Sequence, residues 1–282
     1  KEQNISFIMA SDPDADRIGI MVRDKSGEFI TITGNQNGVI LLDYLIGAMK
    51  RAGTMPEKPV VLKSIVSTEM ARAVAQANGV QCYDTFTGFK FLAEKKNQLE
   101  ESGQGKVIMA FEESYGYMFG DYVRDKDAVT AALILAEAAC YYATQGKTMY
   151  DALQDCYAKY GYYREKTINL VMPGLDGMAK MKEIMAYLRQ NPLNEVAGVK
   201  VVEQKDYQPG TVHNTVTGED STMELSGSNV LRYELEDGTS FIIRPSGTEP
   251  KIKVYILCSD ATQEAADAKV AKYADFAQTI KD

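Results

Sequence analysis

The sequence predicts an α/β fold followed by an α+β domain, and three observations support this prediction. Short apolar runs alternate with helical segments as far as about residue 160, which is typical of strands layered with helices. Several strand-like runs then follow one another, with helical segments placed near both ends of this part. The 282 residues are 45% apolar and 25% charged, which are ordinary values for a globular chain of about two domains.

The elements of the first part follow from apolar runs, caps and turns. Ile5–Ala10 is expected as a buried strand, because an apolar run ends there at Ser11-Asp12-Pro13. Ile18–Val22 and Glu28–Thr33 flank a turn signal and are expected as a hairpin. The other elements expected before residue 161 are the helices 37–52, 67–78, 88–98, 127–144 and 148–160 and the strands 60–66, 81–85 and 107–111.

The composition shifts after Gly161, where a separate α+β domain is expected. Strand-like runs dominate this part, and the stretch 207–221 is expected as a polar loop with His213 on the surface. The elements expected here are the strands 167–172, 199–203, 230–235, 240–243 and 251–258 and the helices 175–190 and 263–280.

The composition also excludes several classes of protein. The net charge of −8 makes the chain a poor ligand for nucleic acids or anionic membranes. The most apolar helical stretch, 128–136, is too short to cross a bilayer. Four cysteines without CxxC spacing and a single histidine argue against a zinc site. Scattered cysteines are typical of reduced thiols, so we expect a cytoplasmic protein.

Three carboxylates follow the first expected strand at alternate positions: Asp12, Asp14 and Asp16, next to Arg17. Carboxylate oxygens that converge from one tight loop suit Mg²⁺ or Ca²⁺. An EF-hand loop begins with the same alternation, but its sixth position is Gly and its twelfth is Glu, whereas here they are Arg17 and Arg23. An acidic turn with solvated side chains is the alternative interpretation.

A second charged loop joins two expected strands: Arg244-Pro245-Ser246-Gly247-Thr248-Glu249-Pro250-Lys251. An arginine fork, two hydroxyls and the exposed backbone N–H groups of a glycine suit a phosphate group. The alternative is an ordinary hairpin loop, which rarely needs Arg, Ser, Thr and Lys together.

Three further loops are ambiguous on their own. A glycine and a lysine open the helix expected at 88–98, an acid and a hydroxyl follow a buried strand where ligands collect in α/β sheets, and two cations stand between acids at 124–127. The alternative interpretations are a solvated helix start, an acidic first helical turn and a salt-bridged surface turn, the last being the usual explanation for such a run. The candidates are Gly88, Lys90, Glu112, Ser114, Arg124 and Lys126.

Taken in order, these loops resemble the α-D-phosphohexomutase superfamily of phosphoglucomutases and phosphomannomutases, from Asp12 to Lys251. The amino-acid sequences of these loops are most similar to those of a bacterial branch of phosphoglucomutases and phosphopentomutases. The resemblance implies the end of a mutase domain 2 (residues 1–33), a complete α/β domain 3 (34–160) and an α+β domain 4 (161–282). The segments that carry it are Asp12-Pro13-Asp14-Ala15-Asp16-Arg17, Thr87-Gly88-Phe89-Lys90, Glu112-Glu113-Ser114-Tyr115-Gly116, Arg124-Asp125-Lys126-Asp127 and Arg244-Pro245-Ser246-Gly247-Thr248.

The family's catalytic phosphoserine lies in domain 1, in a Ser-His-Asn-Pro type loop. The one His-Asn pair of this sequence, His213-Asn214, follows Val212 instead of a serine. We therefore expect a C-terminal fragment that lacks domain 1 and most of domain 2 and is inactive alone. A fragment cut in this way can associate with itself through the exposed edge of its first strand.

The resemblance also implies a reaction and a site. Phosphate would move between C1 and C6 of a hexose through a sugar bisphosphate, with Mg²⁺ on Asp12, Asp14 and Asp16. Arg17 would stabilise the transferred phosphoryl group, and either Lys90 or Lys126 would move the hydroxyl proton. Glucose, mannose and pentose phosphates all remain possible substrates. The substrate contacts implied are Gly88, Glu112, Ser114, Arg124, Arg244, Ser246, Gly247, Thr248 and Lys251.

Two other functions stay open. Haloacid-dehalogenase-type phosphatases also place Asp-x-Asp after a strand, and Gly120-Asp121-x-x-x-Asp125 resembles their later acidic motif. This function leaves the loop at Arg244 unexplained. A non-catalytic sugar-phosphate-binding module would use the loop at Arg244 without any metal.

Overall fold

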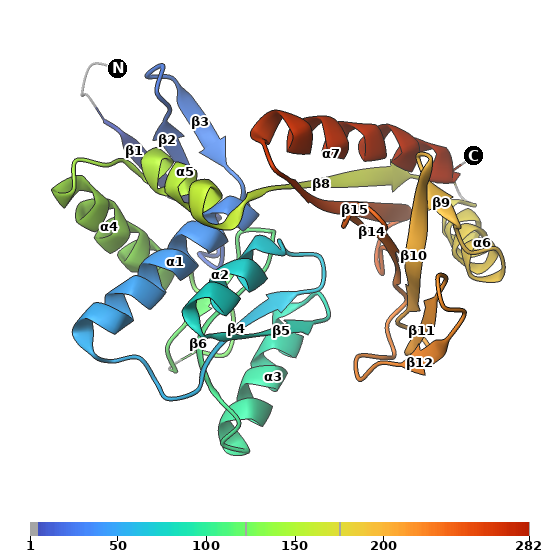
Figure 1. The fold of residues 1–282 in the computed structure, drawn as a ribbon, viewed down its shortest axis with the longest axis horizontal. Coiled ribbons are helices and arrows are strands. Elements are labelled where there is room, and N and C mark those ends of the chain that lie inside the picture. Colours follow the sequence, from blue (N-terminus) through green and yellow to red (C-terminus); the bar gives the residue numbers. More distant parts are fainter. Residues whose placement is uncertain (1–4, 122, 175, 282) are drawn as a thin grey trace. The chain divides into compact units, whose positions relative to one another are not determined.

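The computed structural model describes residues 5–121, 123–174 and 176–281 and divides into two compact units. Unit 1 is Lys1–Gly161 and unit 2 is Tyr162–Asp282. Unit 1 alternates strands with helices, and unit 2 is built on a long antiparallel sheet, with one α-helix early in its sequence and one late (Figure 1). The predicted fold class is confirmed. No helix in the described part of the chain has the length and apolarity that a membrane span requires.

Unit 1 contains two sheets. The first is the antiparallel sheet β1-β2-β3. In the second, ordered β5-β4-β6-β7, the central strand β4 runs parallel to β5 and β6, and the short β7 runs antiparallel at the edge. The strands are β1 (Phe7–Ser11), β2 (Ile18–Arg23), β3 (Phe29–Ile32), β4 (Pro59–Ser64), β5 (Gln81–Thr85), β6 (Lys106–Phe111) and β7 (Tyr117–Phe119).

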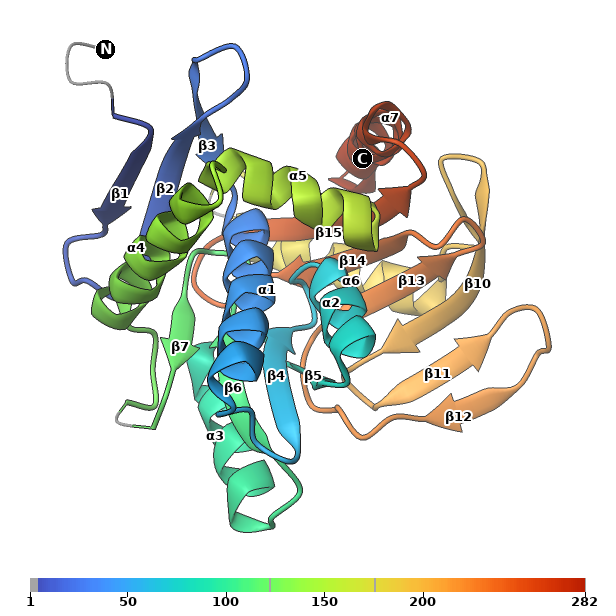
Figure 2. The same cartoon turned by 60° about the vertical axis from the view of Figure 1, so that its left-hand side comes forward.

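The helices of unit 1 pack around the second sheet. Helix α1 packs against α2, α4 and α5, and α3 packs against β4, β5 and β6 (Figure 2). Because β4, β5 and β6 are parallel, the loops that follow them meet where the carboxyl ends of the strands lie, and α/β proteins bind ligands there. The helices are α1 (Gly34–Ala52), α2 (Met70–Asn78), α3 (Phe89–Glu101), α4 (Ala128–Thr144) and α5 (Met149–Tyr160).

The prediction that the first strand is buried was wrong. Strand β1 forms as expected, but four of its five residues are exposed, including Ile8 (40%) and Met9 (38%). The reason is its place in the sheet. It pairs with β2 on one side and lies at the edge of the sheet in the described part of the chain. Self-association through this edge stays a prediction.

Helix α1 begins at a capping box formed by Thr33 and Gln36. Thr33 Oγ1 accepts the N–H of Gln36 at 3.2 Å, and Gln36 Oε1 accepts the N–H of Thr33 at 2.9 Å. Both N–H groups lack a partner inside the helix, so the box satisfies them. We expect Thr33→Ala to lower the free energy of unfolding of unit 1 by about 1 kcal/mol, seen as a lower urea midpoint. Thr54→Ala, at an exposed position after the helix, is the control, and an equal shift in both variants would contradict the capping argument.

Unit 2 contains an eight-stranded antiparallel sheet in which β12-β11-β10-β13-β14-β15-β8 follow one another and β9 pairs with β10. Helix α7 packs on β8 and β15, and α6 packs on β14 and β15 (Figure 1). The elements are β8 (Tyr162–Val171), α6 (Gly177–Gln190), β9 (Glu195–Val196), β10 (Val199–Asp206), β11 (Thr211–Asn214), β12 (Asp220–Thr222), β13 (Leu231–Leu235), β14 (Ser240–Pro245), β15 (Lys251–Asp260), α7 (Gln263–Ala277) and the 3₁₀ helix η1 (Gln278–Lys281).

Two predictions for unit 2 were wrong. The stretch 207–221, expected as a polar loop, contains β11 and the start of β12, whose mostly exposed polar side chains gave no apolar alternation to detect. Strand β8 begins at Tyr162, five residues before its expected start, because its first half also pairs with β15. The expected first residue of α6, Leu175, lies outside the described residues.

Candidate functional site

The carboxylates of Asp12, Asp14 and Asp16 converge, each offering an oxygen within 4.8 Å of the others. We call residues 12–17 the acidic loop. It is tight because Asp12 Oδ1 accepts the N–H groups of Asp16 (3.1 Å) and Arg17 (3.0 Å), and Ala15 has a φ of 55°. The Arg17 N–H is the main cause that lowers the pKa of Asp12. In the described part of the chain, no other cluster of His, Cys, Asp or Glu could hold a metal ion.

Asp16 carries the feature that fits a cation best. Its Oδ2 lies 2.9 Å from Lys126 Nζ, whereas its Oδ1 is shielded from solvent and accepts no hydrogen bond from any described residue. The Arg17 guanidinium stays 3.6 Å away from that oxygen. A buried carboxylate oxygen without a donor is costly, and a cation held between the three carboxylates would satisfy it. A donor set made only of oxygen fits Mg²⁺ or Ca²⁺.

The residues that follow β6 form the second part of the site, which we call the 112–116 loop. Glu112 is only 4% exposed, and its Oε1 accepts the N–H of Gly88 at 2.6 Å. Its side chain therefore joins this loop to the loop that precedes α3. Burial raises the pKa of Glu112, and the hydrogen bond from Gly88 opposes that rise. The acidic helical turn considered as an alternative does not form, because Glu112 N–H bonds to Gly116 O at 3.0 Å and β7 follows.

The acidic loop and the 112–116 loop touch each other. Arg17 and Gly116 form an isolated antiparallel bridge, and the Ile18 N–H donates to Tyr115 O at 3.2 Å. A Cβ on Gly116 would lie 2.6 Å from Lys126 Cδ, so Lys126 also packs closely against this loop. Unit 1 thus brings the acidic loop, the 112–116 loop and Lys126 into one cluster.

The two lysines considered for proton transfer have different surroundings. Lys126 contacts both Asp16 and Asp125; although burial disfavours its charge, hydrogen bonds to these carboxylates raise its pKa. Lys90 lies exposed at the start of α3 with its ammonium 4.7 Å from the centre of the Phe91 ring. It pairs with no carboxylate among the residues that the structure describes.

The structure does not place Arg124 with Lys126. The Arg124 Nε donates to Asn97 Oδ1 at 2.8 Å, and its guanidinium also reaches the Asp121 carbonyl and approaches Glu100. These contacts direct the side chain toward α3. Ser114 lies half-buried in the 112–116 loop.

The loop between β14 and β15 lies in unit 2 and makes hydrogen bonds within itself. Ser246 Oγ accepts the N–H groups of Thr248 (3.4 Å) and Glu249 (3.2 Å), which leaves Gly247 and Thr248 exposed at the tip. Lys251 Nζ lies 2.5 Å from Glu249, and this contact lowers the pKa of Glu249. Arg244, half-buried at the base, pairs with no carboxylate in the described part of unit 2.

Sequence reasoning missed one cation beside this loop. Lys253 lies directly opposite Arg244 in the β14–β15 ladder, and neither side chain makes a direct ion pair with a carboxylate among the described residues, although Lys253 helps to lower the pKa of Glu249. Like charges that face each other on neighbouring strands destabilise a sheet. A bound phosphate would compensate both charges. The available signal was the spacing, because Lys251 and Lys253 are two residues apart and a strand directs such residues to the same face.

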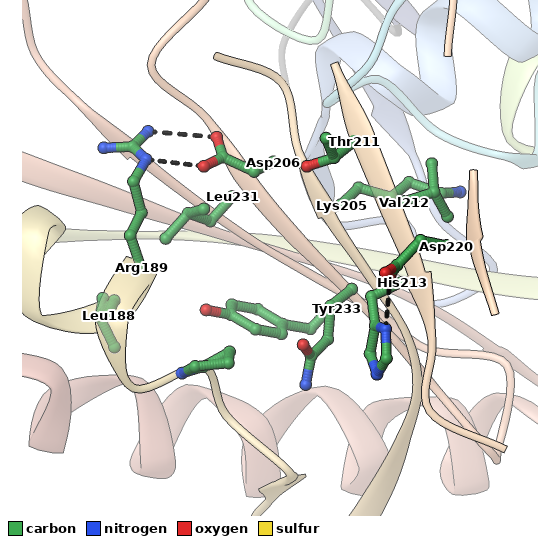
Figure 3. Close-up of a pocket in the computed structure, with 12 residues that line it drawn as sticks. Leu188, Arg189, Lys205, Asp206, Thr211, Val212, His213, Asp220, Leu231 and Tyr233 are labelled. Atoms are coloured by element: carbon green, nitrogen blue, oxygen red, sulfur yellow. Dashed lines mark hydrogen bonds and ion pairs between the residues drawn. The ribbon is translucent and has the colours of Figure 1, made fainter. Parts of the chain in front are cut away.

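A separate cavity of about 200 Å³ lies elsewhere in unit 2 (Figure 3). Arg189 binds Asp206 at one end in this view, and His213 binds Asp220 at 2.8 Å at the other, with Tyr233 between them. Its charged groups are therefore already paired, unlike Arg244. His213 is exposed, as predicted, although it belongs to β11.

The buried Glu112 should make stability depend on pH. The usual glutamate pKa is 4.5 and burial raises it, so the folded chain holds this proton more tightly than the unfolded chain does. The wild-type chain therefore loses stability as the pH rises through the interval between these two pKa values. Glu112→Gln removes this loss but keeps an oxygen to accept the Gly88 N–H. We expect the stability of the variant relative to wild type to rise between pH 4 and pH 8 in urea titrations, whereas the exposed control Glu94→Gln should show no such trend.

Comparisons with known proteins agree with one another. Residues 33–160 match the family model of the phosphoglucomutase/phosphomannomutase alpha/beta/alpha domain III, and residues 168–273 match that of the C-terminal domain. The chain is 37% identical over 256 residues to a phosphoglucomutase of Staphylococcus aureus strain N315. That alignment covers 90% of this chain and 45% of the relative, so the chain spans about half the length of the curated relatives it matches.

Solved structures share the fold. The phosphoglucomutase parafusin from Paramecium is 20% identical with a TM-score of 0.62, over 98% of this chain and 45% of that one. An Aspergillus fumigatus N-acetylphosphoglucosamine mutase, solved with GlcNAc-6P and magnesium, is 14% identical with a TM-score of 0.52, over 97% of this chain and 49% of that one.

Proposed function

Because the chain belongs to the phosphoglucomutase/phosphomannomutase family, we propose that it supplies the metal-binding and phosphate-binding loops of a phosphosugar mutase. In this proposal, phosphate moves between C1 and C6 of a hexose through a sugar bisphosphate, with a phosphoserine outside this chain as the carrier. The observation that carries the proposal is the convergence of the acidic loop, the 112–116 loop and Lys126 in unit 1.

The acidic loop would bind Mg²⁺ through Asp12, Asp14 and Asp16. When bound, Mg²⁺ would neutralise charge on the phosphoryl group in transfer. The Arg17 guanidinium lies within 3.7 Å of Asp12 and Asp16, so it would reach the same phosphoryl oxygens. The magnesium in the related Aspergillus fumigatus structure supports this choice of ion.

The sugar and its second phosphate would be held by the remaining loops. Glu112 and Ser114 would bind ring hydroxyls, with the backbone at Gly88 close to Glu112. The phosphate that does not react would bind at Arg244 and Lys253. The contacts of Arg124 with α3 do not support its substrate role, and the proposal leaves it out. The other residues proposed for this phosphate are Ser246, Gly247, Thr248 and Lys251.

Lys90 is the better candidate to move the hydroxyl proton. A group that takes up a proton must spend part of its time deprotonated. The two carboxylates around Lys126 favour its charged form, so Lys126 is better suited to hold Asp16 in place. Lys90 has no such partner among the described residues and is free to approach a substrate.

The phosphatase alternative has less support. Asp121 would have to act beside Asp12, but it binds Lys96 (2.9 Å) and Lys106 (2.5 Å) instead. Lys106 begins β6, whereas Glu112 follows the end of that strand. A strand of this length spans roughly 17 Å. Asp121 therefore lies near the amino end of β6, whereas the candidate site lies at its carboxyl end.

A calorimetric titration with glucose 1,6-bisphosphate, with and without Mg²⁺, tests the proposal. We expect 1:1 binding that Mg²⁺ strengthens, and no mutase turnover by the 282-residue chain alone. Binding that ignores Mg²⁺ would favour a non-catalytic binding module. Phosphate release that disappears in Asp12→Asn would favour the phosphatase, and turnover by the homogeneous chain would contradict the need for a phosphoserine outside it.

A further inference from the structure

The 112–116 loop contains an acid that the proposed chemistry does not use. Glu113 lies between Glu112 and Ser114, and its carboxylate contacts the end of β4. Its Oε2 accepts a hydrogen bond from Ser64 Oγ at 3.2 Å and lies 3.5 Å from Ser67 Oγ. The two hydroxyls are fully buried and 2.8 Å apart, so one donates to the other and the hydroxyl whose hydrogen is left donates to Glu113.

The loop is also pressed against the start of α1. A Cβ on Gly34 would lie 2.0 Å from the Glu113 carbonyl oxygen, so a side chain at position 34 cannot fit without moving the loop. The hydroxyl of Tyr117, the residue that follows the loop, donates to Gly34 O at 3.0 Å. Between these fixed points the chain passes through Tyr115, whose φ of 68° is unfavourable for a residue with a side chain. Conformations of this kind persist only where the surrounding contacts enforce them.

We propose that Glu113 is a positioning residue that fastens the 112–116 loop to β4 and thereby orients Glu112 and Ser114 toward the sugar. The consecutive side chains of this loop have different contacts. Glu113 is directed to Ser64 and Ser67, which leaves Glu112 to reach Gly88 and the site. This inference rests on the proposed function for the identity of the sugar ligand, but the anchoring itself does not.

Two measurements on the 282-residue chain test this role. The first is hydrogen exchange of the amides of residues 112–117 without any ligand. We expect Glu113→Ala to speed exchange in this segment and to leave the core of unit 2 unchanged. Glu113→Gln keeps an oxygen that accepts the Ser64 hydroxyl, so it should restore protection. The control is Glu94→Ala, at an exposed position on α3.

The second measurement is the dissociation constant for glucose 1,6-bisphosphate. We expect Glu113→Ala to raise it about tenfold, Glu113→Gln to leave it within about twofold, and Ser64→Ala to raise it by a similar factor to Glu113→Ala. The Ser64 and Glu113 effects should not add in the double variant, because both remove the same hydrogen bond. Ser64→Ala also tests the contact if Glu113→Ala fails to fold.

The outcomes separate the two claims. Unchanged exchange of residues 112–117 in Glu113→Ala and Ser64→Ala would overturn the anchoring. Faster exchange with an unchanged dissociation constant would overturn the role in sugar positioning and leave Glu113 a stability residue only. Absence of bisphosphate binding in the wild-type chain would count against the proposed function, and the exchange measurement would still decide whether Glu113 fixes the loop.

Discussion

Replacing Arg244 with alanine is expected to weaken the binding of glucose 1,6-bisphosphate by roughly 50-fold, about 2.3 kcal/mol, in a calorimetric titration of the chain. The reason is that Arg244 is half-buried, lies opposite Lys253, and has no carboxylate partner among the described residues. Its guanidinium is therefore available to a phosphate, and charge-assisted hydrogen bonds of this kind are the strong ones.

The same variant should behave differently in an unfolding experiment. Removing one of two cations that face each other relieves repulsion, so the urea midpoint of unit 2 should stay the same or rise. Lys200→Ala, at an exposed position on β10, is the control for loss of positive charge alone. Equal weakening in Arg244→Ala and Lys200→Ala would mean that general charge attracts the ligand, and a falling midpoint in Arg244→Ala would assign Arg244 a structural role.

Replacing Asp14 with asparagine is expected to weaken Mg²⁺ binding by about 100-fold or more, measured by calorimetry or by competition with Mn²⁺. Changes in residues that merely orient metal ligands already cost 10- to 100-fold, so loss of a charged ligand should cost at least as much. Asp14 is the most suitable of the three acids because it is exposed and accepts no hydrogen bond from the described residues. Its replacement therefore leaves the acidic loop intact.

The same variant should not lose stability, although it binds Mg²⁺ more weakly. The three carboxylates have oxygens within 4.8 Å of one another and repel when no metal ion is bound. Asp14→Asn should therefore leave the urea midpoint of unit 1 unchanged or raise it. Asp24→Asn serves as the control for Mg²⁺ binding, because it also removes an acid from a tight turn of unit 1, where Asp24 Oδ1 accepts the N–H groups of Ser26 and Glu28. Mg²⁺ binding that persists in Asp14→Asn would contradict a metal site in the acidic loop.

The sequence predicted the fold class and most elements because apolar periodicity and caps act locally. Strand β5 is found with its expected bounds, and the helix expected to start at Asn37 begins at Gly34, three residues earlier, because Thr33 caps it. The burial of β1 could not be predicted in this way. An apolar run shows that a strand can form, whereas its exposure depends on which strands lie beside it, and β1 has a partner on only one described side.

In the candidate site, too, local sequence predicted some features, whereas others depend on the fold. Alternate spacing was sufficient to predict that Asp12, Asp14 and Asp16 converge. The partner of Lys126 was not predictable, since Asp16 lies 110 residues earlier in the chain and only the fold brings them together. Lys253 was missed for a related reason, because strand register decides that it faces Arg244.

We propose that the acidic loop and the 112–116 loop of unit 1 bind Mg²⁺ and a sugar, and that the loop at Arg244 in unit 2 binds a phosphate. Hydrogen exchange of the chain with and without glucose 1,6-bisphosphate and Mg²⁺ tests this binding at each loop separately. We expect slower exchange at residues 12–17, 112–117 and 244–251, with no change around the cavity at His213. Unchanged exchange at these three segments, or slower exchange found only at that cavity, would refute the proposal.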